Sequence, residues 1–336
     1  MLLNKLLNLF GKDMAMDLGT ANTLIHTPRD GIVLNEPSVV ALSNRDNKVL
    51  AVGSQAKEYL GRSPEQKLRT LRPMKDGVIA DFDVTSAMIA TFIRQVLQGV
   101  QLIKPRIMIC VPTGITQVEK QAVIQSAQHA GARQVLLLEE PVAAAIGGGL
   151  PIADPVGNMV VDIGGGTTEV GIISMSAVAY SESIRVAGDE MDEAIQRFIR
   201  EEYGLIIGET AAERIKMNLH LGPTARITGK SVVEGVPQAV QIDMARVRES
   251  IREPTSAIVN TVLRTLEKSP PELVSDVMDH GILLTGGGAL LYGLSQQITQ
   301  QARVSTFVDD DPLTTALRGT GAALQQEREL RDMFLN

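Results

Sequence analysis

The sequence predicts an α/β protein built from two related halves. In the first half, an apolar strand ending near Asp17 runs into a turn of Gly, Thr and Ala and then into a second apolar strand. The same pattern returns nearly half a chain later, where the apolar strand containing Asp162 leads into a turn of three glycines and Thr167. A repeat at this distance is typical of an internal duplication, and it sets two α/β domains side by side.

Apolar runs and turn residues predict the elements of the first half in order. Strands are expected near 15–18, 22–25 and 32–34, with a turn between Pro28 and Gly31. Two more apolar strands are expected over 106–111 and 134–138, and the first contains Cys110 as a core thiol. A run of small residues then predicts a helix over 142–147.

The second half turns helical after its own pair of strands. Apolar spacing close to 3.6 predicts helices over 191–203 and 209–219, strand-like pieces over 225–233, and one long helix over 243–268 that Pro270 and Pro271 end. The apolar strand 282–285 then leads into Gly286–Gly288, and a helix is expected from about Ala289.

Composition excludes several classes of protein. The 336 residues carry a net charge of −7 and only 3% aromatic residues, whereas nucleic-acid binding favours basic surfaces and stacking rings. One cysteine rules out an internal disulfide framework and indicates a reducing compartment. No apolar run approaches the ~18 residues of a membrane-spanning helix.

The two Asp-containing turns predict a phosphate site. Glycine lacks a Cβ, so backbone N–H groups can close on phosphate oxygens, and threonine hydroxyls add donors. Asp17 and Asp162 suit Mg²⁺, which keeps several waters and takes few protein carboxylates. One such turn is weak evidence because hairpins often contain it, but two copies half a chain apart are specific.

Three other segments predict contacts to a nucleotide, each with a simpler alternative. Gly286–Gly288 after a strand suits a flat ring or a phosphate, or close packing of a helix on that strand. Glu213 and Lys216 lie on one helix face and suit ribose hydroxyls, or form a surface ion pair. Glu140 at a strand end suits the orientation of a water for attack on a γ-phosphate, or is a solvated loop acid. Neither phosphate turn contains a lysine, which excludes a Walker-type loop.

The order of these motifs resembles the superfamily of actin, Hsp70 and sugar kinases, and within it the MreB family of bacterial actins. The resemblance covers about residues 15–323 and is carried by the segments 17–24, 35–39, 72–81, 162–170, 187–195, 270–273 and 311–314. It implies an actin-like duplicated ATPase fold, with two domains that are each split into two subdomains around a central nucleotide cleft. Leu24 stands where eukaryotic actin has a lysine in its first phosphate loop, as is usual in this family.

The resemblance also implies roles for individual residues, with ATP and Mg²⁺ as cofactors. Glu140 and Thr167 position the hydrolytic water, and Asp17 and Asp162 act on Mg²⁺ through water. The implied nucleotide contacts are Gly19, Thr20, Ala21, Asn22, Gly164, Gly165, Gly166, Glu213, Arg214, Ile215, Lys216, Gly286, Gly287, Gly288 and Ala289.

The implied domain organisation follows the actin pattern. A membrane-binding helix over 1–11 precedes a first domain over 12–145, which has a smaller subdomain inserted at about 33–70. The second domain covers 146–311 with a smaller subdomain at about 182–245, and 312–336 return to the first domain.

Residues 1–12 depart from the acidic average, because they contain two lysines and no acid. Helical spacing gathers Leu2, Leu3, Leu6, Leu7, Leu9 and Phe10 on one arc, which is typical of a helix lying in a membrane interface. A terminal helix docked on the protein's own core, or a frayed end, is the alternative. The family resemblance adds a hydrophobic loop at Leu102 and Ile103 as a second membrane contact.

The function implied by the resemblance is that of an ATP-dependent filament. Slow ATP hydrolysis is coupled to polymerisation, and cytoplasmic filaments, paired as protofilaments, lie peripherally on the inner membrane. There they organise cell-wall elongation and maintain rod shape with membrane proteins such as RodZ and MreC, and they bind no nucleic acid. The alternatives within the superfamily are an Hsp70-like ATPase chaperone module, disfavoured because the chain is short, and a sugar kinase.

Overall fold

Two five-stranded sheets with the same strand order form the centre of the protein. The computed structural model describes residues 13–62, 67–97 and 104–335. The residues predicted to bind a membrane, Leu2, Leu3, Leu6, Leu7, Leu9, Phe10, Leu102 and Ile103, lie outside these described residues. Within the described ranges, no helix combines the length and apolar character needed to cross a bilayer.

The strand order confirms the predicted duplication. The first sheet runs β10 (Gln134–Glu139), β9 (Arg106–Val111), β1 (Met14–Leu18), β2 (Asn22–Thr27) and β3 (Gly31–Pro37). The second runs β18 (Thr306–Val308), β17 (Ile282–Thr285), β11 (Asn158–Ile163), β12 (Thr168–Ser174) and β13 (Ala177–Ile184). In both sheets the first three strands are parallel and the last two are antiparallel hairpin partners. Strands β1 and β11, which carry Asp17 and Asp162, therefore occupy equivalent central places.

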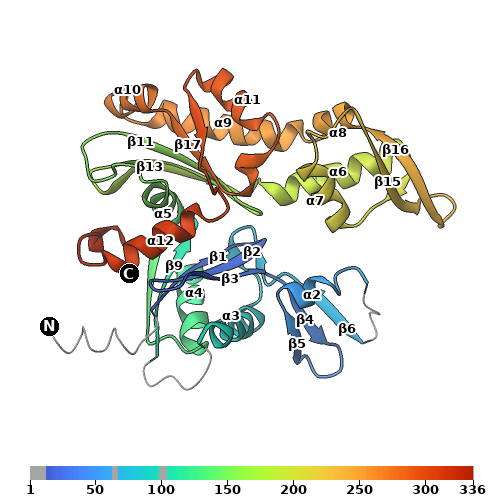
Figure 1. Ribbon diagram of the computed structural model, residues 1–336, viewed down its shortest axis with the longest axis horizontal. Helices are drawn as coiled ribbons and strands as arrows, with labels where there is room; N and C mark the ends of the chain where they lie inside the picture. The colour runs from blue at the N-terminus through green and yellow to red at the C-terminus, as the bar shows by residue number, and fades with distance from the viewer. Residues whose placement is uncertain (1–12, 63–66, 98–103, 336) are drawn as a thin grey trace.

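Helices cover both sheets (Figure 1). The first core packs β1 and β9 against α3 (Phe82–Leu97) and α4 (Gln117–His129), with Phe92 fully buried. The second core packs β11 and β17 against helices that include α6 (Gly188–Tyr203), α9 (Arg252–Lys268) and α11 (Leu294–Ala302), while α10 (Pro271–His280) lies beside β11. Cys110 is buried in β9, as expected of a core thiol.

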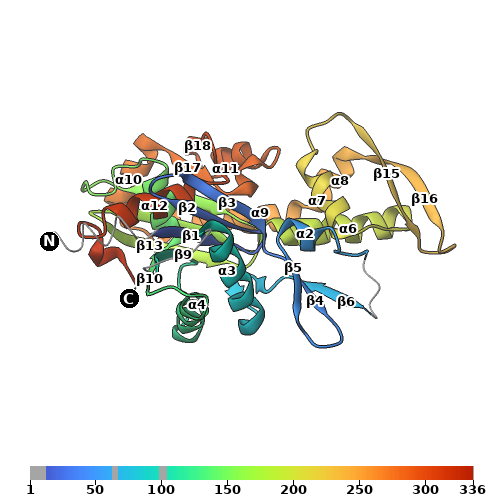
Figure 2. The same ribbon diagram turned by 60° about the horizontal axis from the view of Figure 1, so that its bottom comes forward.

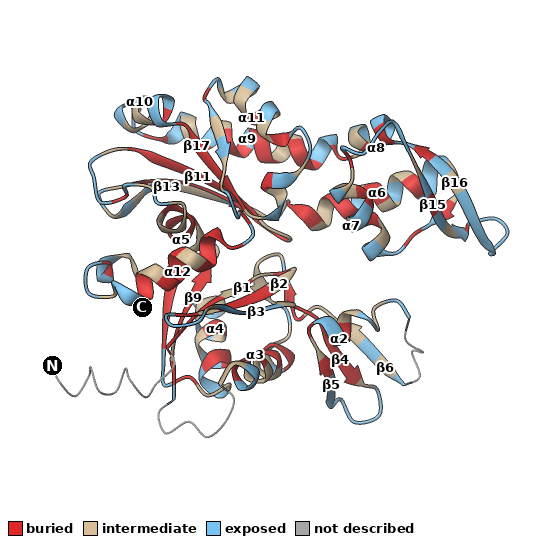
Figure 3. Ribbon diagram, in the orientation of Figure 1, coloured by how far each residue is buried: buried red, intermediate tan, exposed pale blue. Residues whose placement is uncertain are grey.

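Two helices, α5 (Glu140–Gly147) and α12 (Thr315–Gln325), lie between the two sheets (Figures 1 and 3). Their backbones touch, because a Cβ added at Gly147 would lie 1.9 Å from the carbonyl oxygen of Thr315. A Cβ added at Gly319 would likewise lie 1.7 Å from the carbonyl oxygen of Ala143. Glycine at these two positions permits an approach that no side chain allows. This close pair joins the two halves of the molecule.

Two smaller sheets extend from the main body at one end (Figures 1 and 2). One contains β5 (Val49–Val52), β4 (Val40–Ser43) and β6 (Leu68–Leu71), beside the short helix α2 (Ser54–Lys57). The other contains β14 (Leu205–Ile206), β15 (Thr224–Ser231) and β16 (Pro237–Asp243), beside α6, α7 (Glu209–Met217) and α8 (Met244–Ser250). A short hairpin of β7 (Met74–Lys75) and β8 (Val78–Ile79) follows the first of them.

Two predicted helices were wrong in detail. The segment 243–268 forms two helices, α8 and α9, that meet at Ile251. Pro254 accounts for the break, because a proline ring clashes with the carbonyl four residues earlier and offers no N–H to it. After Gly286 the chain forms a single 3₁₀ turn over Gly287–Leu290, and α11 begins only at Leu294, after Gly293 with a left-handed φ of 85°.

Candidate functional site

The turns that follow β1 and β11 meet face to face. A Cβ added at Gly165 would lie 2.9 Å from the Cβ of Ala21, and one added at Gly166 would lie 2.7 Å from Oγ1 of Thr20. Any larger residue at either glycine would push the two turns apart. The structure therefore brings together two predicted phosphate turns that are far apart in the sequence.

Both turns offer free backbone donors at this meeting point. Among the residues that the structure describes, no acceptor receives the N–H groups of Thr20, Ala21, Gly165 or Gly166. Unpaired N–H groups on successive turn residues form a concave site that favours an anion. The site is supported from the side by Thr20, whose Oγ1 accepts the N–H of Gly77 at 3.0 Å.

Four carboxylates, those of Asp17, Glu140, Asp162 and Glu169, lie close enough for their charges to interact. Burial raises the pKa of Asp17 to about 6. Burial, and then the charges of Asp17 and Glu169, raise the pKa of Asp162 to about 8. Burial, and then the charges of Glu169, Asp162 and Asp17, hold the pKa of Glu140 well above its usual range. The pKa of Glu169 rises to about 7 through burial, against the hydrogen bonds that it accepts from Ser183 and Thr113.

This carboxylate cluster fits a hard cation held through water. Buried carboxylates with raised pKa values lack compensating positive charge, which a divalent cation supplies. Within the described ranges, no three His, Cys, Asp or Glu side chains converge closely enough to hold a metal directly. Mg²⁺ binds with few protein ligands and retains several waters, so Asp17 and Asp162 suit it in the manner predicted.

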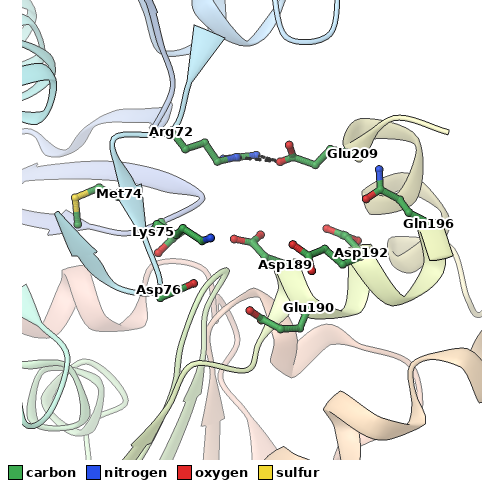
Figure 4. Close-up of a pocket in the computed structure, with 11 residues that line it drawn as sticks. Arg72, Met74, Lys75, Asp76, Asp189, Glu190, Asp192, Gln196 and Glu209 are labelled. Carbon is green, nitrogen blue, oxygen red and sulfur yellow. Dashed lines mark hydrogen bonds and ion pairs between the residues drawn. The ribbon is translucent and has the colours of Figure 1, made fainter. Parts of the chain in front are cut away.

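A cavity of about 350 Å³ opens beside the turns (Figure 4). Arg72 and Lys75 line it from the segment between β6 and β8, and acidic residues of α6 face them, including Asp189 and Asp192. Arg72 donates to Oε1 of Glu209 across the cavity. An ion pair across the cavity therefore joins the segment after β6 to the start of α7.

The residues predicted to hold a ribose already have protein partners. Glu213 pairs with Lys57 of α2 at 3.3 Å, which makes a second ion pair across the cleft. Lys216 donates to Oδ2 of Asp192 and to the carbonyl oxygen of Gly188, both at 2.8 Å. The alternative of a simple surface pair between Glu213 and Lys216 is wrong, because each side chain has a different partner. Arg214 and Ile215 lie between them on α7, and Ile215 is buried in the core of the second domain.

The glycine turn at Gly286 packs on the end of β11. Gly286 has a φ of 77°, and a Cβ added there would lie 2.4 Å from Oδ1 of Asp162. A Cβ added at Gly288 would lie 2.2 Å from Cγ2 of Ile163. The glycine turn at 286–288 therefore lies beside the carboxylate of Asp162, and close packing accounts for the glycines at 286 and 288. A nucleotide contact by Gly286–Ala289 stays a prediction.

Two residues near the turns, Glu169 and Asp189, were not predicted from the sequence. Glu169 is 1% exposed and lies opposite Asp162 in the strand register. The sequence feature that could have identified it is a single charged residue within the otherwise apolar strand β12. Asp189 donates its backbone N–H to the carbonyl oxygen of Gly165 at 2.8 Å, and burial raises the pKa of its carboxyl to about 6. The sequence feature that could have identified Asp189 is its place as an acidic residue in the first turn of α6.

Comparison with known proteins agrees with this architecture. The family model for MreB/Mbl protein matches residues 11–332. The cell shape-determining protein MreB of Escherichia coli (strain K12) is 48% identical over 335 residues, which cover 96% of each chain. The cell shape-determining protein Mbl of Bacillus subtilis (strain 168) is 46% identical over 328 residues, which cover 96% of this chain and 98% of that protein.

Solved structures match the fold over nearly the whole chain. MreB5 of Spiroplasma citri bound to ADP has a TM-score of 0.90 and 32% identity, and covers 96% of this chain and 98% of its own. The same protein has also been solved bound to AMPPNP. MamK in a double helical filament has a TM-score of 0.78 at 20% identity, over 93% of this chain and 99% of its own, and supports the fold alone. The predicted actin-like fold is thereby confirmed, and the chain belongs to the MreB/Mbl family.

Proposed function

We propose that this protein is an ATP-dependent, filament-forming cell-shape protein that works on the inner membrane. The observation that carries the proposal is the meeting of two phosphate turns from duplicated halves over a cluster of buried carboxylates. The relatives named as cell shape-determining proteins, and the ADP and AMPPNP complexes of MreB5, support it. The domain boundaries proposed are those expected from the sequence, with the nucleotide between 12–145 and 146–311.

Different residues around the cleft bind the phosphates, Mg²⁺, the ribose and the base in this proposal. The N–H groups of Thr20, Ala21, Gly165 and Gly166 receive phosphate oxygens, assisted by Gly19, Asn22 and Gly164. Asp17 and Asp162 orient the waters of Mg²⁺, which supplies the positive charge that the buried cluster lacks. Glu213–Lys216 hold the ribose, and Gly286–Ala289 face the base and the α-phosphate. Glu213 then shares its carboxylate between the ribose and Lys57.

Hydrolysis depends on a water held by Glu140 and Thr167. Glu140 is the first residue of α5, and Thr167 ends the turn before β12. In this proposal both side chains face the cleft between the two domains, and its closure brings them together onto one water. Polymerisation closes the cleft in this proposal, and slow hydrolysis then times the life of the filament.

Glu140→Ala is expected to bind ATP normally and to release phosphate at least about tenfold more slowly, because it removes the carboxyl group that orients the attacking water. Phosphate release and ATP affinity are measured on the same preparation. The matched control is Glu139→Ala, the neighbouring carboxylate at the end of β10, which should leave the rate within about threefold of wild type. Normal hydrolysis by Glu140→Ala would remove this residue from the mechanism.

Membrane attachment is proposed through residues outside the described ranges. Leu2, Leu3, Leu6, Leu7, Leu9 and Phe10 form the apolar face of an amphipathic helix over 1–11, and Leu102 and Ile103 add a second contact. Filaments held in this way on the inner membrane would guide wall-elongation proteins such as RodZ and MreC.

Sedimentation tests assembly and attachment together. With ATP and Mg²⁺ the protein is expected to pellet without lipid, and with anionic liposomes it should pellet at lower protein concentration. Deletion of residues 1–11 should abolish most liposome binding while leaving ATP-dependent pelleting intact. Pelleting that does not depend on ATP would contradict the filament proposal, and equal lipid binding by the truncated chain would contradict the helix as the main anchor.

A further inference from the structure

Glu169 is a buried carboxylate that the mechanism above does not use. It is the second residue of β12, is 1% exposed, and lies opposite Asp162 of β11 in the strand register. A buried carboxylate is costly unless hydrogen bonds satisfy its oxygens. The contacts of these oxygens therefore indicate what this side chain does.

The carboxylate of Glu169 joins the two halves of the molecule. Oε2 accepts the backbone N–H of Thr113 at 3.1 Å, and Thr113 follows β9 of the first sheet. Oε1 accepts the hydroxyl of Ser183 at 2.6 Å, and Ser183 belongs to β13 of the second sheet. One side chain is thus held from both sheets, and a change in the angle between the domains must strain or break its bond to Thr113.

The same face of β12 covers the start of α5. Side chains two residues apart in a strand point to the same side, so Glu169 and Gly171 share a face. A Cβ added at Gly171 would lie 2.9 Å from Cβ of Pro141, the residue after Glu140. A shift of β12 therefore displaces the first turn of α5, where Glu140 is located.

We propose that Glu169 is a positioning residue, which ties the orientation of the two domains to the placement of Glu140 through its hydrogen bond to Thr113. The inference rests on the proposed function, because it takes Glu140 as the residue that orients the hydrolytic water. Closure of the cleft aligns Glu140 only while the tie between β12 and the loop after β9 is intact. A misplacement of about 1 Å at the reacting group can cost about a hundredfold in rate.

Three variants distinguish the hydrogen bond between Glu169 and Thr113, called the tie here, from an effect of the charge of Glu169 or of its packing. Glu169→Ala removes both bonds and should lower kcat for phosphate release by about tenfold or more, with ATP affinity within about threefold. Glu169→Gln should restore kcat to within about threefold of wild type, because its amide oxygen accepts from Thr113 and its amide N–H donates to Ser183. Ser183→Ala leaves the bond between the domains and should also stay within about threefold.

Each outcome decides the proposal. A Gln variant as slow as the Ala variant would mean that the charge matters and the tie does not. A Ser183→Ala variant as slow as Glu169→Ala would place the effect within the second sheet, and an unchanged Glu169→Ala would remove the role altogether. If Glu169→Ala does not fold, Glu169→Asp takes its place, because its shorter side chain cannot keep both bonds. It should then lower kcat by about tenfold, and a wild-type rate would overturn the tie.

Two further variants serve as controls. Glu182→Ala removes a carboxylate of β13 that pairs with Arg264 and Lys268, and should leave kcat unchanged. Glu140→Ala is assayed in parallel, since normal hydrolysis by that variant would overturn the proposed mechanism whatever Glu169 does. Failure of the tie and failure of the proposed function thus give different results.

Discussion

Asp162→Asn is expected to stabilise the nucleotide-free protein, by an amount that grows as the pH rises from about 4 to about 8. The pKa of this carboxyl is about 8 in the folded protein, against 3.8 for an ordinary aspartate, which is the value expected in the unfolded chain. Between these values the folded state binds a proton that the unfolded state has lost. The free energy of unfolding therefore falls with rising pH through this range and levels off above pH 8.

The size of this effect is large. Each tenfold change in proton affinity between the two states corresponds to about 1.4 kcal/mol, so the separation of the two pKa values amounts to several kcal/mol at pH 8. Asparagine has the shape of the protonated carboxyl and carries no charge to bury. The wild type should thus approach the variant at pH 4 and unfold at a clearly lower temperature than the variant at pH 8.

Thermal unfolding in EDTA at several pH values measures this difference. The exposed substitution Asp30→Asn makes the same change of charge away from the cleft and should shift Tm little at any pH. The gain should also come with a loss of function, because Asp162→Asn should no longer be stabilised by ATP with Mg²⁺. A variant that is less stable than wild type at pH 8 without nucleotide would contradict the burial of this charge.

Gly319→Ala is expected to cost about 3 kcal/mol or more in the free energy of unfolding, at or above the usual range for overpacking. A methyl group at this position would lie 1.7 Å from the carbonyl oxygen of Ala143. Neither backbone can yield locally, since Gly147 makes the reciprocal contact with Thr315. The two helices must separate, and the cores on both sides must follow.

Denaturant unfolding of Gly319→Ala measures this cost by linear extrapolation. The control is Gly208→Ala, which adds the same methyl group where no atom lies within 4 Å and should cost less than about 1 kcal/mol. Equal losses from both substitutions would mean that the contact between α5 and α12 is not tight. ATP affinity of the folded fraction should fall as well, because this pair holds the two phosphate turns in register.

The sequence was informative where a local pattern has one structural solution. A strand that ends in an Asp and a glycine turn, repeated half a chain later, predicted both the duplication and the pair of turns that meet at Gly165 and Ala21. The prediction of a single helix over 243–268 was wrong. The apolar periodicity continues through Pro254, but a proline at this position interrupts the helical backbone.

Pairings between distant residues lay beyond the sequence. Helical spacing places Glu213 and Lys216 on one face, but their partners Lys57 and Asp192 come from elements that only the fold brings near. The same holds for Glu169, since its bond to Thr113 depends on how two sheets face each other. The roles of Glu140 and Asp162 stay predictions, which the variants at these two positions test.

The ion pair between Lys57 and Glu213 would link nucleotide affinity to the contact between α2 and α7. In the proposed function Glu213 also holds the ribose, so ribose hydroxyls and Lys57 share one carboxylate, and a bound ribose weakens the link between the two smaller subdomains proposed here. Linkage is reciprocal, so whatever separates these subdomains must in turn strengthen the hold of Glu213 on the ribose. In the proposed filament, a subunit that pulls α2 of the next subunit away from α7 would slow the release of ADP from that next subunit. The filament would then retain ADP without any new contact to the nucleotide.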